Sequence, residues 1–198
     1  MIEIKDKNKK PPYLLFYDLL DKAYLNYQDS VDAISISSFN KNKNEVQCRY
    51  VNLKYIIDEE WIFFSNYESE KAKSFKSHNQ ITALFYWNTI DAQIRIKANI
   101  KKASSTISDE HFANRSNIKN ALAISSKQSK KIKSYDSVIE NHQAILKSSN
   151  AHLRPKYWGG YSFVPYYFEF WEGHESRINK REVFDKIDGI WKHSFLQP

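Results

Sequence analysis

The stretch from Gln93 to Ala103 reads QIRIKANIKKA, and it decides the kind of fold that this chain forms. Ile94, Ile96 and Ile100 alternate with charged or amide side chains, and Ala98 completes the apolar series. A repeat of two residues places the apolar side chains on one face of a β-strand and the polar side chains on the other. A strand with one apolar face and one wet face is typical of an antiparallel sheet.

Other strand-like segments lie on both sides of this stretch, so the chain is mainly β. Each is rich in apolar, β-branched or aromatic residues and ends in turn residues. Pro165 interrupts one of them and marks an edge or a bulge, because proline cannot donate a hydrogen bond to a ladder. The segments are 32–39, 45–53, 61–66, 81–87, 158–171, 182–184 and 190–195.

Helical segments separate these strands. The first begins after Pro11-Pro12, which suits a helix entry, and Ser108 or Asp109 is expected to cap the third. Many antiparallel strands with few helices predict an α+β fold that is mainly β, built on a closed barrel with peripheral helices. Helical spacing of apolar residues predicts the helices at 13–27, 69–77, 108–125 and 132–147.

The bulk composition bounds the organisation and excludes several mechanisms. The chain of 198 residues is expected to hold a single domain at 13–198, preceded by a charged, mobile tail at 1–12 that lacks the apolar core of a signal peptide. The four glycines all lie after position 158, which excludes a glycine-rich phosphate loop and a dinucleotide-binding turn. A single cysteine, Cys48, excludes a disulfide framework and fits a reducing cytoplasm, where we expect the protein. The sequence has no apolar run of about 18 residues, so no membrane-spanning helix is expected.

Charge and histidine content alone do not point to a site. Lys and Arg exceed Asp and Glu by 30 to 23, but the lysines are scattered, so we do not expect a nucleic-acid partner. The six histidines have no zinc-ligand spacing, so no metal site is expected. Cys48 lies within a predicted strand and no nucleophile elbow occurs, so covalent catalysis has no support.

Cations and amides instead lie at the ends of predicted elements. Arg49 and Lys54 flank a strand segment, and Lys71 follows a loop-to-helix junction, where backbone N–H groups favour anions. A few such cations can bind the phosphate of a small ligand, and aromatic residues line sites for flat ligands. Aromatic motifs occur at 158–161 and 169–173.

Taken in this order, the segments resemble the pyridoxamine 5′-phosphate oxidase family of split-barrel flavoproteins. The resemblance extends from about Pro12 to Pro198, and no single motif carries it alone. The segments that carry it are RYVNLK at 49–54, FFSNYESEKA at 63–72, LFYWNTIDAQIRI at 84–96, HFANRS at 111–116, SKQSKKI at 126–132, WGGY at 158–161, and EFWEG with RINKR within 169–181.

The resemblance implies a homodimer of six-stranded antiparallel split barrels, with residues 158–198 as the C-terminal dimerisation segment. It also implies FMN as the cofactor, held in clefts at the dimer interface by residues of both chains. The positions that match the family's flavin-binding residues are Arg49, Tyr50, Val51, Asn52, Leu53, Lys54, Phe64, Ser65, Glu70, Lys71, Gln93, Gln128, Ser129, Trp171 and Arg181.

The family's reaction belongs to vitamin B6 metabolism. It oxidises pyridoxamine or pyridoxine 5′-phosphate to pyridoxal 5′-phosphate, with O2 as the oxidant and H2O2 as a product. The resemblance therefore implies an FMN-dependent oxidase of small phosphorylated substrates, in which Arg177 and Asn179 lie over the substrate ring and are expected to be catalytic. The positions that match the family's substrate-binding residues are Lys54, His111, Arg115, Lys119, Arg177 and Asn179.

Four of these positions depart from the family's residues. Glu70 stands where the family has an arginine beside Lys71, and a carboxylate repels a phosphate unless it turns away. His111, Lys119 and Asn179 stand at the family's Tyr, Ser and His positions, and an asparagine cannot carry a proton at neutral pH. Two alternatives therefore stay open: a flavin oxidoreductase for a different substrate, as in phenazine biosynthesis, and a non-enzymatic flavin-binding protein.

Overall fold

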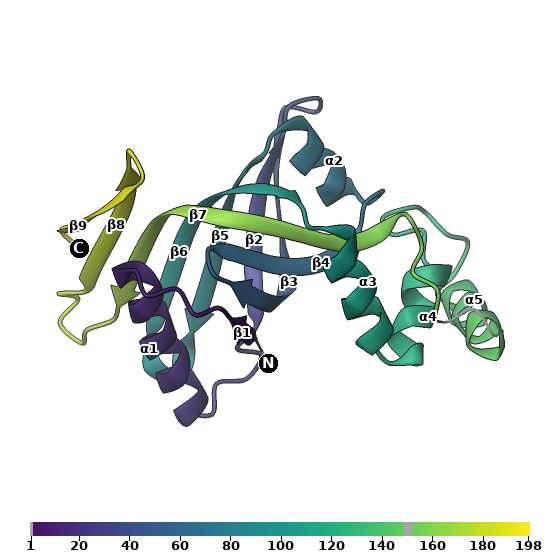
Figure 1. Cartoon of the computed structure of the whole chain (residues 1–198), viewed down its shortest axis with the longest axis horizontal. Helices are drawn as coiled ribbons and strands as arrows, with labels where there is room; N and C mark the ends of the chain where they lie inside the picture. Colours follow the sequence, from purple (N-terminus) through teal and green to yellow (C-terminus); the bar gives the residue numbers. More distant parts are fainter. Residues whose placement is uncertain (1, 149–151) are drawn as a thin grey trace.

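The computed structural model describes residues 2–148 and 152–198, and Figure 1 colours the chain from purple at the N-terminus to yellow at the C-terminus. Residue 1 of the predicted tail and residues 149–151 of the predicted domain lie outside the described residues. The strands are β1 (Glu3–Lys5), β2 (Ala33–Asn40), β3 (Glu45–Ile57), β4 (Glu60–Asn66), β5 (Gln80–Trp87), β6 (Ala92–Lys102), β7 (Trp158–Glu172), β8 (Lys180–Ile187) and β9 (Ile190–Phe195). The helices are α1 (Pro11–Leu25), α2 (Glu70–Ser77), α3 (Ser105–Asn114), α4 (Asn117–Ser125) and α5 (Tyr135–Lys147), with a short 3₁₀ turn, η1, at Asn88–Ile90.

Six of the described strands close into an antiparallel barrel. Around the barrel the order is β3, β2, β5, β6, β7 and β4, and β4 pairs again with β3. Closure gives each strand of the ring a hydrogen-bonded neighbour on both sides. The expected six-stranded antiparallel barrel is thus confirmed, and β1, β8 and β9 extend the sheet beyond it.

The alternation in β6 takes the form that the sequence predicts. Ile94 and Ala98 are fully buried in the barrel core, whereas Arg95 and Lys97 on the other face are partly exposed. The neighbouring strand β7 pairs with β6 from Tyr161 to Glu172, with β4 over its first part and with β8 over its last part. Its ladder with β6 shifts register opposite Pro165, so the predicted edge or bulge is a bulge.

Aromatic side chains fill the barrel and join it to α1. Phe16 of α1 packs on Trp61 of β4 with ring centroids 4.5 Å apart, and Tyr13 packs on Phe168 of β7 at 5.3 Å. All four side chains are buried, so α1 belongs to the core rather than to the surface. None of the helices in the described ranges is long and apolar enough to cross a membrane.

The N-terminal segment differs from the predicted mobile tail. β1 pairs in parallel with residues 55–57 of β3, and Ile2 beside it is only 5% exposed within the hydrophobic core. Asn8 is also buried and donates a hydrogen bond to the Asp58 carboxylate at 2.5 Å. The charged composition conceals this anchor, because isolated isoleucines among lysines and acids carry no recognisable periodicity.

The predicted helix at 108–125 is two helices. Ser104 caps α3 by accepting a hydrogen bond from the Ile107 N–H, so the helix begins before the predicted cap at Ser108 or Asp109. Ser116 then caps α4 in the same way, and Arg115 lies at the break between the two helices. Side-chain capping stops and restarts a helix without a proline or glycine, which explains why the break is not evident from composition.

Replacing Ile2 by alanine tests whether the N-terminal segment packs on the barrel. We expect the free energy of unfolding to fall by about 2–4 kcal/mol, because a buried isoleucine loses its contacts and leaves a cavity. The matched control is Ile190→Ala, whose side chain is 61% exposed, and a change at such a site should stay within about 0.5 kcal/mol. Denaturant titrations measure both values, and equally small losses would show that this segment does not pack.

Candidate functional site

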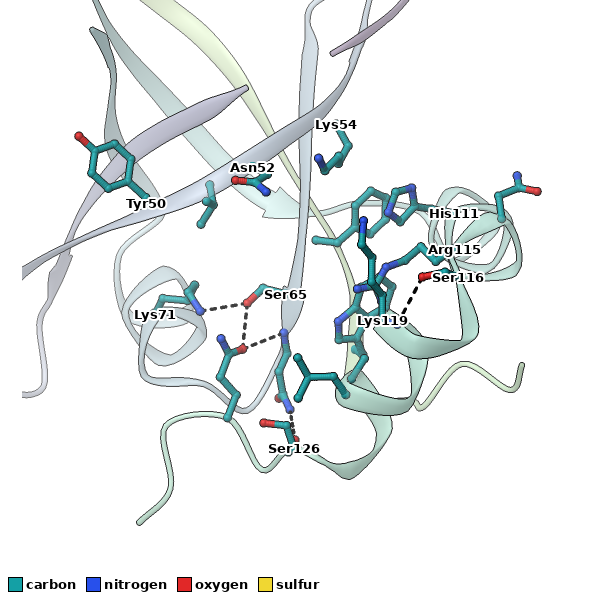
Figure 2. Close-up of a pocket in the computed structure, with 18 residues that line it drawn as sticks. Tyr50, Asn52, Lys54, Ser65, Lys71, His111, Arg115, Ser116, Lys119 and Ser126 are labelled. Atoms are coloured by element: carbon teal, nitrogen blue, oxygen red, sulfur yellow. Dashed lines mark hydrogen bonds between the residues drawn. The ribbon is translucent and has the colours of Figure 1, made fainter. Parts of the chain in front are cut away.

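A cavity of about 710 Å³ lies between helices α3 and α4 on one side and strands β3 and β4 on the other. Figure 2 shows Lys71 and Ser65 on one side of it and His111, Arg115 and Lys119 on the helical side. A volume of this order suits a cofactor-sized ligand. The lining residues are Tyr50, Val51, Asn52, Lys54, Phe64, Ser65, Asn66, Lys71, His111, Asn114, Arg115, Ser116, Lys119, Leu122, Ala123, Ser126, Gln128 and Trp158.

One wall of the cavity is a stack of flat rings. The His111 imidazole lies on Phe64 with ring centroids 3.7 Å apart and planes 6° from parallel, and Trp158 stacks on Phe64 at 5.4 Å. Gly160, the ladder partner of Phe64, leaves room for this ring, since a Cβ there would lie 3.2 Å from Phe64 Cε1 and 2.8 Å from the Ala103 Cβ. The wall is therefore a planar surface suited to a flat ligand.

His111 is held as a neutral imidazole. Its Nδ1 lies 2.7 Å from the Tyr55 hydroxyl, and a neutral ring that accepts this bond carries its proton on Nε2. Burial lowers the pKa of His111 to about 4, and three neighbouring cations add to the shift: Arg115, Lys54 and Lys119. At neutral pH His111 therefore offers a hydrogen-bond donor without a charge.

Lys71 is a half-buried cation that has no carboxylate partner within the described part of the chain. Its ammonium donates a hydrogen bond to Ser65 Oγ at 3.1 Å. Burial, followed by the charge of Arg49, lowers the pKa of Lys71 to about 8. Ser69 caps α2, so the positive end of the helix dipole lies beside this ammonium. An anion placed here would compensate both the charge and the helix end.

A second pair of cations lies on the helical side of the cavity. The Arg115 guanidinium lies 4.6 Å over the Trp158 ring, and burial lowers its pKa. Lys119 lines the same side, and neither cation forms an ion pair with any residue that the structure describes. Lys54 differs, since its ammonium lies 2.7 Å from the Asp32 carboxylate. Arg115 and Lys119 are thus the cations left for a second anion.

Glu70 does not oppose an anion at Lys71. Its carboxylate accepts hydrogen bonds from Lys43 at 2.9 Å and from Lys73 at 2.6 Å, and these bonds lower the pKa of Glu70 to about 2. Two lysines therefore neutralise the acid that directly precedes Lys71. The Glu70 carboxylate is thus bound to other partners, so it does not repel a phosphate at Lys71.

The cavity collects most of the predicted substrate residues and part of the predicted flavin residues. Those that line it are Tyr50, Val51, Asn52, Lys54, Phe64, Ser65, Lys71, His111, Arg115, Lys119 and Gln128.

Four predicted residues do not line the cavity, although each is next in sequence to a residue that does: Arg49, Leu53, Glu70 and Ser129. Leu53 is fully buried in the barrel core. Arg49 donates to Ser38 Oγ at 2.9 Å, and Ser129 lies at the start of the Glu70 helix, where its hydroxyl accepts from the Glu70 N–H at 3.5 Å.

The remaining predicted flavin residues form a row on another part of the sheet. The register pairs Gln93 of β6 with Trp171 of β7, and Trp171 with Arg181 of β8. Because opposite residues of an antiparallel ladder share a face, these three side chains form the 93–171–181 row. Figure 1 shows β8 and β9 at the opposite end of the barrel from α3, α4 and α5, so one chain does not bring this row to the cavity.

Arg177 and Asn179 lie in the turn between β7 and β8, on the same side of the molecule as the row. Arg177 has a φ of 59°, in the left-handed region, and Asn179 Oδ1 accepts from the His174 N–H at 3.1 Å. The turn therefore uses the carbonyl of the Asn179 amide, which leaves its NH2 group as a donor.

Several lining residues were not predicted as site residues. Trp158 lines the cavity from the aromatic motif at 158–161, and Tyr55, which directly follows the predicted cation Lys54, does not line the cavity itself but holds His111 there. Their neighbours in sequence were the available signal. Leu122 and Ala123 reach the cavity because α4 folds over it, and they have no such signal.

The arrangement offers planar stacking, two separate anion sites and uncharged hydrogen-bond donors. Within residues 2–148 and 152–198, no group of three or more His, Cys, Asp or Glu side chains could hold a metal ion. The chemistry that these groups can perform themselves is binding and orientation of flat, anionic molecules.

Comparison with known proteins identifies relatives along the whole chain. The family model for the pyridoxine 5′-phosphate oxidase C-terminal dimerisation region matches residues 158–198. The pyridoxine/pyridoxamine 5′-phosphate oxidase of Colwellia psychrerythraea is 34% identical over 169 residues, which cover 84% of this chain and 77% of that protein. The protein of the same name from Leptospira interrogans is 30% identical over 201 residues, which cover 100% of this chain and 92% of that protein.

Solved structures share the fold. PhzG from Burkholderia lata 383, solved in complex with tetrahydrophenazine-1-carboxylic acid, has a TM-score of 0.90 over 96% of this chain and 95% of that chain, at 22% identity. A pyridoxamine 5′-phosphate oxidase-related, FMN-binding protein from Nostoc punctiforme has a TM-score of 0.78 over 96% of this chain and 100% of that chain, at 11% identity. At these identities the likeness establishes the split-barrel fold.

The uncharged state of His111 predicts a loss of stability on acidification. The folded-state pKa of about 4 lies below the ordinary value of about 6.5 for an unfolded chain, so the unfolded state takes up the proton first. The contribution is complete above about pH 6.5 and is lost as the pH falls toward about 4. His111→Phe keeps a ring on Phe64 and removes the titration, so the variant should lose less stability than the wild type over this range.

Urea titrations at several pH values between these limits measure the effect. His152→Phe is the control, because His152 is exposed and lies outside the cavity. Parallel pH profiles for the wild type and His111→Phe would contradict a neutral, buried His111.

Proposed function

The chain belongs to the pyridoxine/pyridoxamine 5′-phosphate oxidase family, whose cofactor is FMN, and we propose that it oxidises pyridoxamine or pyridoxine 5′-phosphate to pyridoxal 5′-phosphate. The alcohol and O2 give the aldehyde and H2O2, and the amine also consumes water and releases ammonia. When bound, FMN supplies the redox chemistry by accepting a hydride from the substrate carbon and passing the electrons to O2. The residues of this chain bind and orient the two molecules.

Two separate anion sites within one cavity carry this proposal. Lys71, Ser65 and the start of α2 form the first, and Arg115 with Lys119 forms the second across the cavity. An enzyme that joins a phosphorylated cofactor to a phosphorylated substrate must hold two phosphates, each by charge-assisted hydrogen bonds. The planar wall between the sites suits the flat rings of the phosphorylated cofactor and the phosphorylated substrate.

The residues at the first anion site fit FMN. Lys71 and Ser65 can both donate to a phosphate dianion, which would relieve the cost of burying the ammonium. Gln128 lies beside them, with its Oε1 at 3.4 Å from Ser65 Oγ, and its amide offers both donors and an acceptor to a polar ring edge. Glu70 leaves this site free because Lys43 and Lys73 bind its carboxylate.

The second anion site suits the phosphate of the substrate. Lys119 adds a charge where the family has a serine, and this charge substitutes for Lys54, which is engaged by Asp32. His111 adds the Nε2–H donor of a neutral ring, in place of the family's tyrosine hydroxyl. Anchoring the phosphate fixes the place of the reacting carbon and makes the transfer effectively intramolecular.

We further propose that a second copy of the chain completes the site. Trp158 lines the cavity and Trp171 belongs to the row, and both lie on β7. At about 3.3 Å per residue they are roughly 40 Å apart along that strand, too far to share one ligand. A two-fold homodimer brings the row of one protomer, with Arg177 and Asn179, to the cavity of the other. The match of residues 158–198 to a dimerisation region supports this arrangement.

A second candidate is an FMN oxidoreductase of the same scaffold that acts on another substrate. Asn179 favours it, because the turn uses its carbonyl oxygen and the remaining NH2 group cannot carry a proton at neutral pH. Flavin binding without turnover is the third alternative. The three differ in what happens after FMN has bound.

Titration of the purified protein with FMN, followed by anaerobic addition of pyridoxamine 5′-phosphate, separates these alternatives. We expect FMN fluorescence to be quenched on binding and the flavin absorbance to bleach when the substrate is added. Air should restore the absorbance and yield pyridoxal 5′-phosphate with H2O2. A bound flavin that neither phosphorylated substrate reduces would favour the second or third candidate, and a protein that does not bind FMN would contradict all three.

Lys119→Ala tests the substrate phosphate site. We expect the KM for pyridoxamine 5′-phosphate to rise by about tenfold with little change in kcat, because a lost charge-assisted hydrogen bond weakens ground-state and transition-state binding alike. Lys130→Ala is the control, since Lys130 is exposed and does not line the cavity. Unphosphorylated pyridoxamine should show the same KM with both variants, and an equal loss for both substrates would refute phosphate binding at Lys119.

A further inference from the structure

Glu169 of β7 is a buried carboxylate outside the cavity. Its side chain is 4% exposed, and it is the one charged residue among the buried residues of the described chain. It lies two positions before Trp171 and so points to the same face of the sheet. The ladder places it directly opposite Arg95 of β6, next to the 93–171–181 row.

Three side chains converge on this carboxylate. Arg181 donates two hydrogen bonds to Oε1, from Nε at 3.0 Å and from a terminal nitrogen at 2.8 Å. Tyr167 donates to Oε2 at 2.8 Å, and Arg95 donates to the same oxygen. Burial alone would raise the pKa of Glu169, but these hydrogen bonds outweigh it and hold the pKa below its ordinary value. The ionised carboxylate and two guanidinium groups leave a net positive charge on this face.

Arg181 is therefore held in place before any ligand arrives. Its second terminal nitrogen donates to the Gln197 carbonyl at 2.9 Å, so the guanidinium is fixed from two sides. Within the described chain, these contacts leave one N–H on each terminal nitrogen for a ligand. A long side chain that is already ordered loses little conformational entropy when it binds.

We propose that Glu169 is a positioning residue, which holds Arg181 in the 93–171–181 row in the orientation that receives FMN. The inference rests on the FMN binding proposed above. Glu169 acts through Arg181 and does not touch the cofactor itself. It also limits the net charge of the Arg95–Arg181 pair, since its carboxylate forms ion pairs with both of these partly buried arginines.

Two substitutions separate the position of Arg181 from the charge of the cluster. Glu169→Asp keeps the charge but shortens the side chain by one methylene, so it cannot reach both arginines. Glu169→Gln keeps the length and loses the charge. We expect each variant to weaken FMN binding to the apoprotein by at least about tenfold, measured by quenching of FMN fluorescence.

The matched control is Glu182→Gln on β8. Glu182 is a partly buried carboxylate that binds Lys180 and His193, and it lies next to Arg181 in sequence but on the opposite face of the strand. The FMN affinity of the Glu182→Gln protein should stay within about twofold of the wild-type value. Far-UV circular dichroism and thermal melting of each apoprotein show which variants are folded. If Glu169→Gln does not fold, Glu169→Asp retains the buried charge and decides the question.

A double-mutant cycle with Arg181→Ala distinguishes positioning from general destabilisation. If Glu169 acts through Arg181, adding Glu169→Asp to Arg181→Ala should cause no further loss of FMN affinity. Folded Glu169 variants that bind FMN as tightly as the wild type, or additive losses in the cycle, would overturn the inference. These outcomes require that the wild-type protein binds FMN, so they are distinct from a failure of the proposed function, in which the wild type itself binds no FMN.

Discussion

The pairing of β7 with both β4 and β6 closes the barrel, and the position of each site residue depends on it. The first part of this strand sets Gly160 against Phe64 and so builds the planar wall of the cavity. The last part sets Trp171 between Gln93 and Arg181 and so builds the row. The bulge at Pro165 lies between these two parts and allows the strand to bend from one set of neighbours to the other.

The second constraint is the distribution of charge around the cavity. The chain is basic, and of the four Lys and Arg residues that line the cavity only Lys54 forms an ion pair with a described carboxylate. Asp32 forms an ion pair with Lys54, and Glu70 forms ion pairs with Lys43 and Lys73. Lys71, Arg115 and Lys119 face the cavity uncompensated by any described residue, and burial disfavours the charge of Lys71 and of Arg115. An anionic ligand would supply the negative charge that the described residues do not place beside these cations.

The barrel could be predicted from sequence because its strands alternate in a period that is visible residue by residue. The grouping of Gln93, Trp171 and Arg181 could not, since it depends on the register between strands that are far apart in sequence. The resemblance assigned these residues to one cofactor, but only the ladders show that they form a row separate from the cavity. The hydrogen bond between Tyr55 and His111 joins a strand to a helix, and no local sequence pattern predicts it.

The errors at the N-terminus and in the helices have a common physical origin. β1 is held by pairing with β3 and by one buried isoleucine, neither of which alters the composition of a charged segment. The division of the predicted 108–125 helix depends on which serine turns its hydroxyl back to the chain. Glu70 shows the same limit for a site residue, because its partner Lys43 lies on a hairpin turn that is distant in sequence.

The length of β7 has a genetic consequence. In a two-fold dimer, each active centre would combine the cavity of one polypeptide with the 93–171–181 row of the other. Neither polypeptide alone would then contain a complete centre. A subunit defective only in the cavity and a subunit defective only in the row would assemble into a mixed dimer with one doubly damaged centre and one intact centre. Two inactive alleles of this kind would restore activity to each other when expressed together, whereas two alleles damaged in the same half would not.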